Sequence, residues 1–223
     1  MYGITENTKD PISNLPIPVG IHEDVIFEGA TFEPLKEGNP PLLQYHFRDK
    51  DGNVLKPIIW ELDPERIQKM AEDYPKEHKS NNEEKGYKKG QFITPEQAVE
   101  IASERFNVFH KHILTKFVDE QTIIEGQKGV NSYATFAKSV VSILEKADLT
   151  PVRLKVVYDS KGKWSQLPNF PPFIELMSVP KSESRLRMTS FDNTTPAPPA
   201  TPVETPETVS SSDGYTAVDD PGF

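Results

Sequence analysis

The sequence predicts an α+β protein that consists of a small antiparallel β-barrel, helices inserted between its third and fourth strands, and a disordered acidic C-terminal tail. Three observations support this fold class. Runs rich in β-branched and aromatic residues, typical of strands, occupy much of 21–61 and 152–176. Helical patterns fill much of 64–148, between the two groups of strands. The chain after Phe191 is rich in Pro, Thr and Ser, with six acidic residues and no basic one.

The N-terminal part of the chain predicts an arm and three strands. Residues 1–20 are expected to form an extended arm, because their prolines prevent regular helix. The next run, GIHEDVIFEGATFEPL, favours a strand that ends near Leu35. In LLQYHFRDKDGNVLKPIIWEL two strand-like runs flank Asp51–Gly52, a pair that favours a hairpin turn.

The helical block begins at Asp63–Pro64, where an N-cap residue precedes a proline at the first helical position. A short helix is predicted from there to about residue 74, and the polar, lysine-rich stretch 75–91 is predicted to be a loop. The motif TPEQ, which starts at Thr94, fits a capping box, and apolar residues at helical spacing follow it. A second amphipathic helix is predicted over about 133–147.

The C-terminal part of the domain predicts the remaining strands. VRLKVVYDSKGKWSQLP reads as a hairpin that turns around Ser160-Lys161-Gly162, and the apolar segment FPPFIEL closes the domain. This order of elements fits the five-stranded oligonucleotide-binding (OB) barrel, which commonly binds single strands. We therefore expect an OB-like nucleic-acid-binding domain over 21–180, with a helical insertion over about 64–148. Residues 181–223 are expected to form a disordered linker and tail.

Composition limits the class of protein. The formal net charge of −9 comes largely from the acidic tail, so the body is near neutral and can carry a local basic face. The chain has no cysteine, which excludes disulfides and cysteine-based zinc sites. No stretch approaches the ~18 consecutive apolar residues that a membrane-spanning helix needs. We expect a cytoplasmic protein, in the host cytoplasm if the chain is viral, that makes no contact with a membrane.

Basic and aromatic side chains on the predicted strands are candidates for binding a single strand. Alternation along 152–158 separates an apolar row from Arg153 and Lys155. Cations neutralise phosphates, and flat rings stack on bases whatever the sequence. The predicted nucleic-acid-binding residues are His46, Arg48, Lys56, Trp60, Tyr87, Lys88, Lys89, Arg153, Lys155, Lys161, Lys163 and Trp164.

A purely structural role for these residues stays open as the alternative to nucleic-acid binding. Each tryptophan can belong to the core, and the lysines in a hairpin or a loop can simply be solvated. On the strand over 42–48, we assign Leu43, Tyr45 and Phe47 to the core rather than to base stacking, which leaves His46 and Arg48 on the opposite face.

Catalytic signatures are weak. The sequence has no glycine-rich phosphate loop, no GxSxG and no HExxH motif. His110 and His112 lie two residues apart on a predicted helix, so they point to different faces and are poorly placed to chelate one metal. We therefore predict no catalytic residues, metal or cofactor, and a protein that is not an enzyme.

The last residues, DGYTAVDDPGF, suit capture by a partner protein. The ring and carboxylate of Phe223 fit an apolar pocket that holds one Arg or Lys, while Asp219 and Asp220 can meet a basic rim. The predicted partner-binding residues are Asp219, Asp220, Pro221 and Phe223. An arbitrary acidic terminus is the alternative.

The chain resembles single-stranded DNA-binding proteins of tailed bacteriophages. The tip DDPGF is similar to the tips of that group, and LQYHFRDKDGNVLKPIIWE and LKVVYDSKGKWSQLPNFPPFIE are similar to its strand pairs. The sequence departs from the bacterial version at Gly222, where that tip has proline. The resemblance implies sequence-tolerant binding of single-stranded DNA in replication, recombination and repair. It also implies that the tail recruits a polymerase, helicase or nuclease.

Two other functions stay open. The chain can instead be a phage virion or scaffolding protein whose tail docks to a neighbouring subunit. A recombination-associated nuclease, or its regulator, would need an acid cluster that is not apparent in the sequence. Self-association into a homo-oligomer is also left open.

Overall fold

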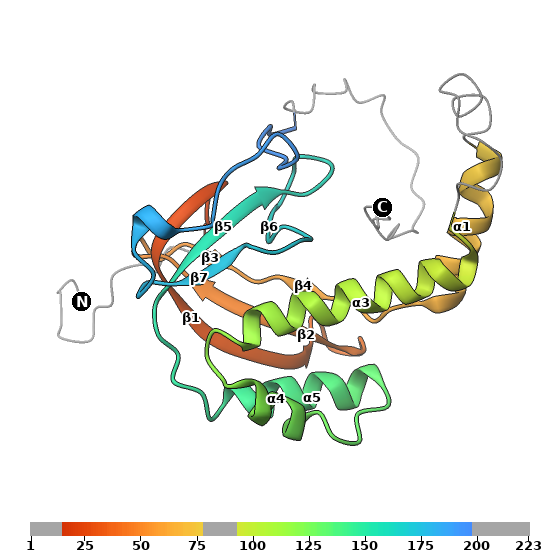
Figure 1. Cartoon of the computed structure of the whole chain (residues 1–223), viewed down its shortest axis with the longest axis horizontal. Coiled ribbons are helices and arrows are strands. Elements are labelled where there is room, and N and C mark those ends of the chain that lie inside the picture. Colours follow the sequence, from red (N-terminus) through yellow and green to blue (C-terminus); the bar gives the residue numbers. More distant parts are fainter. Residues whose placement is uncertain (1–14, 78–92, 198–223) are drawn as a thin grey trace, which may run out of the picture.

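The computed structural model describes residues 15–77 and 93–197 (Figure 1). These residues form an α+β fold whose core is a nearly closed, five-stranded antiparallel barrel, and four helices are inserted into it. The strands pair in the order β3-β2-β1-β5-β6, which is consistent with an OB-like barrel. The helices lie between the third and fourth strands of the barrel, so the predicted fold class is confirmed.

Strand β1 (Gly20–Pro34) takes part in both halves of the barrel. Its C-terminal half pairs with β2 (Pro41–Arg48), and its N-terminal half pairs with β5 (Val152–Tyr158). The register shifts between Phe27 and Gly29 and again between His22 and Val25. Such bulges bend a strand and increase its twist. One long strand can therefore curve from one side of the barrel to the other.

The third and fifth strands of the barrel are each split in two. Lys56–Pro57 separates β3 (Val54–Leu55) from β4 (Ile58–Ile59), because proline has no N–H to contribute to a ladder, and both pieces pair with β2. On the other side, β6 (Ser165–Gln166) and β7 (Ile174–Leu176) both pair with β5.

The described end of the predicted N-terminal arm docks on β3. Leu15 O accepts a hydrogen bond from Val54 N (2.8 Å), and Ile17 N donates to Val54 O (3.1 Å). The Ile17 side chain is completely buried in the core. The arm is thus extended here, as expected, but it belongs to the barrel. Residues 1–14 lie outside the described residues.

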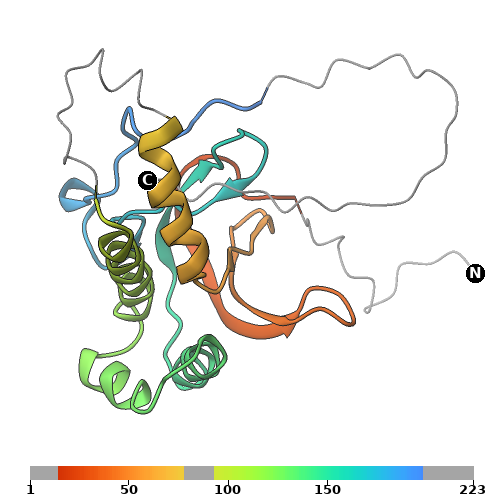
Figure 2. The same cartoon turned by 90° about the vertical axis from the view of Figure 1, so that its right-hand side faces the viewer.

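The helical block contains α1 (Pro64–Glu77), α3 (Pro95–Leu114), α4 (Glu120–Gly126) and α5 (Tyr133–Leu144). The predicted capping box of α3 is present, since Thr94 and Gln97 each bond the other's backbone N–H. Helix α5 packs against β1, and α1 packs against α3 on the side of the molecule that Figure 2 faces. None of the helices in the described part of the chain is both long enough and apolar enough to cross a membrane.

The core lies between the barrel and the helices. Leu43, Tyr45 and Phe47 are buried, which confirms their assignment to the core face of β2. The ring of Phe117 stacks on that of Phe27, with centroids 4.6 Å apart. The buried residues of β5 that face this core are Val152, Leu154 and Val156.

The described structure continues past the predicted boundary at residue 180. After a short 3-10 helix (Lys181–Glu183), residues 184–197 run back along β5, and we call them the C-terminal strap. Asn193 O accepts a hydrogen bond from Tyr158 N, and Ala197 N donates to Gly162 O, each at 2.8 Å. The prediction that the linker begins at 181 is therefore wrong. Residues 198–223, with most of the predicted tail, lie outside the described residues.

Candidate nucleic-acid interface

The loop between β5 and β6, residues 159–164, presents two lysines and a tryptophan. One carboxylate oxygen of Asp159 accepts hydrogen bonds from Lys163 N (2.6 Å) and Trp164 N (3.1 Å), and Gly162 provides the left-handed turn with φ of 67°. Lys161 and Lys163 are exposed, and the Trp164 side chain is 71% exposed. The loop backbone is thus held in place while its basic and aromatic side chains project into solvent.

Trp60 is exposed at the end of the third strand. It follows β4 directly and is 65% exposed. Tyr133 fixes this end of β4, because its hydroxyl accepts a hydrogen bond from Leu43 N (2.9 Å) and donates one to Ile59 O. Burial raises the pKa of Tyr133, so the hydroxyl keeps its proton at neutral pH. Both tryptophans therefore lie on the surface, and the interpretation that places them in the core is wrong.

The β5–β6 loop and the chain that leaves β4 for α1 both lie on the side of the barrel where α1 stands (Figure 1). Trp164 belongs to that loop, and Trp60 directly follows β4 in the sequence. Helices α4 and α5 lie below the barrel in the same view.

The outer face of β2 carries mixed charge. His46 Nε2 lies 2.9 Å from Thr31 Oγ1, and Arg48 Nε forms an ion pair with Glu28 at 2.6 Å. Burial and the charge of the nearby Lys56 lower the pKa of His46, so the ring is neutral at pH 7. Of the three predicted binding residues on this face, Lys56 is the exposed one. Arg48 has a carboxylate partner that a phosphate would have to displace.

Arg153 and Lys155 do not form an exposed basic row, contrary to expectation. They are 4% and 7% exposed. Arg153 pairs with Glu175 of β7 (2.7 Å) and with Glu23 of β1 (3.3 Å), while Lys155 pairs with Asp192 of the strap (2.9 Å). The strap and β7 cover the outer face of β5, so these two cations join β5 to β7, β1 and the strap. They are not available to phosphates in this conformation.

The remaining predicted residues lie outside the described residues. These are Tyr87, Lys88 and Lys89 of the lysine-rich loop, and Asp219, Asp220, Pro221 and Phe223 of the tail.

The two histidines of α3 point to different elements, as predicted. The Tyr45 hydroxyl and His110 Nδ1 share a buried hydrogen bond of 2.6 Å, whereas His112 Nε2 accepts from Phe173 N (3.3 Å) and Ile174 N (3.4 Å). Burial lowers the pKa of His110 to about 3 and that of His112 to about 4, so both are neutral at pH 7. They tie α3 to β2 and to the start of β7. In the described ranges, no three His, Asp or Glu side chains are grouped to hold a metal ion.

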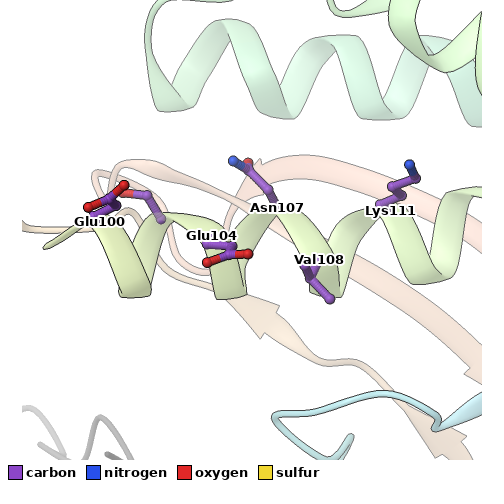
Figure 3. A pocket seen from close by; sticks show the side chains of 6 residues that line it. Glu100, Glu104, Asn107, Val108 and Lys111 are labelled. Carbon is purple, nitrogen blue, oxygen red and sulfur yellow. The ribbon is translucent and has the colours of Figure 1, made fainter. Parts of the chain in front are cut away.

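Concave surfaces in the described structure are shallow. One of about 530 Å³ lies along α3, where Glu100 and Glu104 stand beside Asn107, Val108 and Lys111 (Figure 3). Two carboxylates against one lysine disfavour an anionic ligand there. Another of about 490 Å³ lies between α4 and α5 and carries both Asp119 and Glu125. Neither resembles a phosphate-binding groove.

An exposed aromatic residue beside α3 was not predicted as a site residue. Phe170, in the segment between β6 and β7, is 54% exposed, and the guanidinium carbon of Arg105 on α3 lies 5.0 Å from its ring centroid. Phe170 begins FPPFIEL, the apolar segment that was predicted to close the domain. Pro171 and Pro172, which follow it, are the signal that this part of the segment is not a strand.

Comparison of the chain with models of known protein families, with curated proteins and with solved structures found no match.

Proposed function

We propose that the chain is a sequence-tolerant single-stranded DNA-binding protein, without enzymatic activity, that acts in DNA replication, recombination or repair. The observation that carries the proposal is the exposure of two tryptophans, Trp60 and Trp164, near exposed lysines on an OB-like barrel. Burying an indole removes roughly 200 Å² from water, which is worth about 5 kcal/mol at ~25 cal/mol/Å². Leaving two such rings in solvent forgoes that stabilisation, which suggests that a ligand covers them.

The positions of these residues suit an oligonucleotide. OB barrels bind single strands on the face of strands two and three and on the loop between strands four and five. Trp60 ends the third strand, and Lys161, Lys163 and Trp164 lie in the loop between the fourth and fifth strands. Stacking on an aromatic ring is worth ~1–3 kcal/mol per base and tolerates any sequence, while each lysine neutralises a phosphate.

The described part of the strap ends at this loop. Ala197 N donates to Gly162 O at 2.8 Å, in the loop that carries Lys161 and Lys163, and the acidic residues of the tail follow later in the sequence. We propose that the tail competes weakly with DNA for these lysines and that Phe223, with Asp219 and Asp220, recruits replication or recombination proteins. If so, a chain that ends at residue 212 binds oligonucleotides more tightly at low salt and loses its partners. Unchanged affinity at low salt would count against the competition, and retained partners against the recruitment.

The direct test is fluorescence anisotropy of labelled oligo-dT at several salt concentrations, with the full chain and with duplex as competitor. The variant Lys161→Glu/Lys163→Glu is compared with Lys128→Glu/Lys138→Glu, which makes the same charge change at exposed positions by α4 and α5. We expect the first variant to weaken binding at least tenfold. It should also lower the salt slope, which is the dependence of the logarithm of affinity on the logarithm of salt concentration, by roughly 1.4, because each of two phosphate contacts on a single strand contributes ~0.7. We expect the second to have little effect.

Three outcomes contradict parts of the proposal. Failure of the wild-type chain, and of the chain ending at residue 212, to bind at low salt would refute single-strand binding and favour a docking role in a virion or scaffold. Efficient competition by duplex would refute the preference for single strands. Equal losses in the two charge variants would show that only the overall charge matters, not the β5–β6 loop.

A further inference from the structure

Phe170 is exposed although the chain on both sides of it is firmly held. Before it, Gln166 pairs with Val157 of β5, and Leu167 is buried. After it, Phe173 is completely buried and its backbone N donates to His112 Nε2 on α3. The exposure of the Phe170 ring therefore cannot be attributed to a loosely held segment.

Arg105 orients the exposed ring. Its guanidinium carbon lies 5.0 Å from the centroid of the Phe170 ring, within the range of a cation–π contact. Because Phe170 is still 54% exposed with Arg105 over one face, the rest of the ring remains accessible to a ligand. An exposed aromatic ring that is backed by a guanidinium can receive a flat base.

The spacing along the chain places Phe170 within reach of the proposed binding loop. Phe170 lies six positions after Trp164, and a fully extended chain spans at most ~3.3–3.6 Å per residue, so their Cα atoms lie within about 22 Å of each other. A single OB domain contacts ~4–16 nucleotides, and such a strand covers this distance. The segment that carries Phe170 projects on the same side of the barrel as the β5–β6 loop (Figure 1).

We infer that Phe170 is a third base-stacking residue for single-stranded DNA, backed by Arg105, and that it extends the binding path from the β5–β6 loop toward α3. The inference rests on the proposed function and adds to it. It makes α3 part of the interface, although none of the residues predicted from the sequence lies on that helix.

The test compares Phe170→Ala with Phe191→Ala, which removes an equally large ring that is 97% exposed in the strap. With labelled oligo-dT, we expect Phe170→Ala to weaken binding about 5- to 150-fold, the range for loss of one stacked base. The Phe191→Ala chain should bind like the wild type. If the wild type binds and Phe170→Ala binds equally well, the inference fails while the proposed function stands. If the wild type does not bind at all, the proposed function fails.

A second readout does not depend on affinity. In a Trp60→Phe/Trp164→Phe chain, which lacks both native tryptophans, Phe170→Trp places a single fluorophore at the inferred site. Oligo-dT should quench this fluorophore by stacking, and a Phe191→Trp fluorophore in the same background should not respond. Equal responses, or none at position 170 when the oligonucleotide is bound, would overturn the inference.

The role of Arg105 can be separated from direct phosphate contact. If Arg105 only backs the ring, Arg105→Gln weakens binding severalfold and leaves the salt slope unchanged. A slope that falls by roughly 0.7 would show instead that Arg105 contacts a phosphate, and the backing role would be wrong.

Discussion

Replacing His110 should remove a defined part of the acid sensitivity of the fold. His110 is buried among Phe106, Phe109 and Phe136, with the Tyr45 hydroxyl on Nδ1 and no hydrogen-bond partner for Nε2 within the described structure. A proton on this ring would place a charge among phenylalanines without a carboxylate to offset it. Burial accordingly lowers the pKa of His110 to about 3, from an ordinary value near 6.5.

The size of the effect follows from this difference in pKa. Between pH ~6.5 and ~3 the unfolded chain binds a proton at this residue and the folded chain does not, so acid favours unfolding by about 1.4 kcal/mol per pH unit. At pH 5 the loss is about 2 kcal/mol relative to pH 8, and above pH ~6.5 the contribution is fully present. That is a large fraction of a typical stability of ~5–15 kcal/mol.

The assay is urea unfolding of the wild type and of His110→Asn at pH 8 and pH 5. The asparagine amide can still hydrogen-bond to Tyr45 but does not titrate, so the stability difference between the two pH values should shrink by about 2 kcal/mol. His112→Asn is the comparison: because the pKa of His112 is lowered to about 4, the effect of this variant at pH 5 should be of similar size, and the two variants should differ only below pH ~4. An unchanged pH dependence in His110→Asn, or an NMR titration of His110 near pH 6.5 in the folded protein, would refute the reasoning.

Two further predictions concern the elements that hold the interface. Gly162→Ala would place a Cβ 2.6 Å from Ala197 N, whereas Gly129→Ala, at a similar positive φ, meets no atom within 4 Å. By urea unfolding, Gly162→Ala should therefore cost about 1–3 kcal/mol more than Gly129→Ala, and equal costs would contradict the packing of the strap on the loop. Tyr133→Phe leaves Leu43 N and Ile59 O without their partner, so it should cost about 1–3 kcal/mol and shift the emission of Trp60. Unchanged stability and emission would show that Tyr133 does not hold the end of β4.

Features of the fold that depend on neighbouring residues could be predicted from the sequence. The hairpin at Asp51–Gly52, the capping box at Thr94 and the alternation along β2 are signals carried within a few residues, and all are present. Helix α4 was not predicted, because it is only seven residues long and Ile123 is its only buried side chain. A helix of two turns with one buried residue has no periodicity to detect.

The candidate site depended on contacts between distant parts of the chain. Alternation separates the two faces of β5, but it cannot show that Asp192, far along the sequence, covers Lys155. The exposure of Trp60 and Trp164 could not be predicted from the sequence either, since a tryptophan at the end of a strand can be buried in the core or exposed to solvent. Phe170 was overlooked because an apolar run suggests burial, whereas its ring projects from a segment anchored on both sides.

The path of β1 through both halves of the barrel sets an order in which the chain can fold during synthesis. Its pairing with β2 joins neighbours across a short turn, with Pro34 opposite Pro41. Its pairing with β5 joins Gly20 to Val156, so the whole helical block must leave the ribosome before this half of the strand has a partner. At ~5–20 residues per second, the first residues of β1 wait roughly 7–27 s as an unpaired edge, because Val156 lies 136 positions after Gly20. A nascent chain stalled before β5 should therefore be the species most prone to aggregate or to need a chaperone.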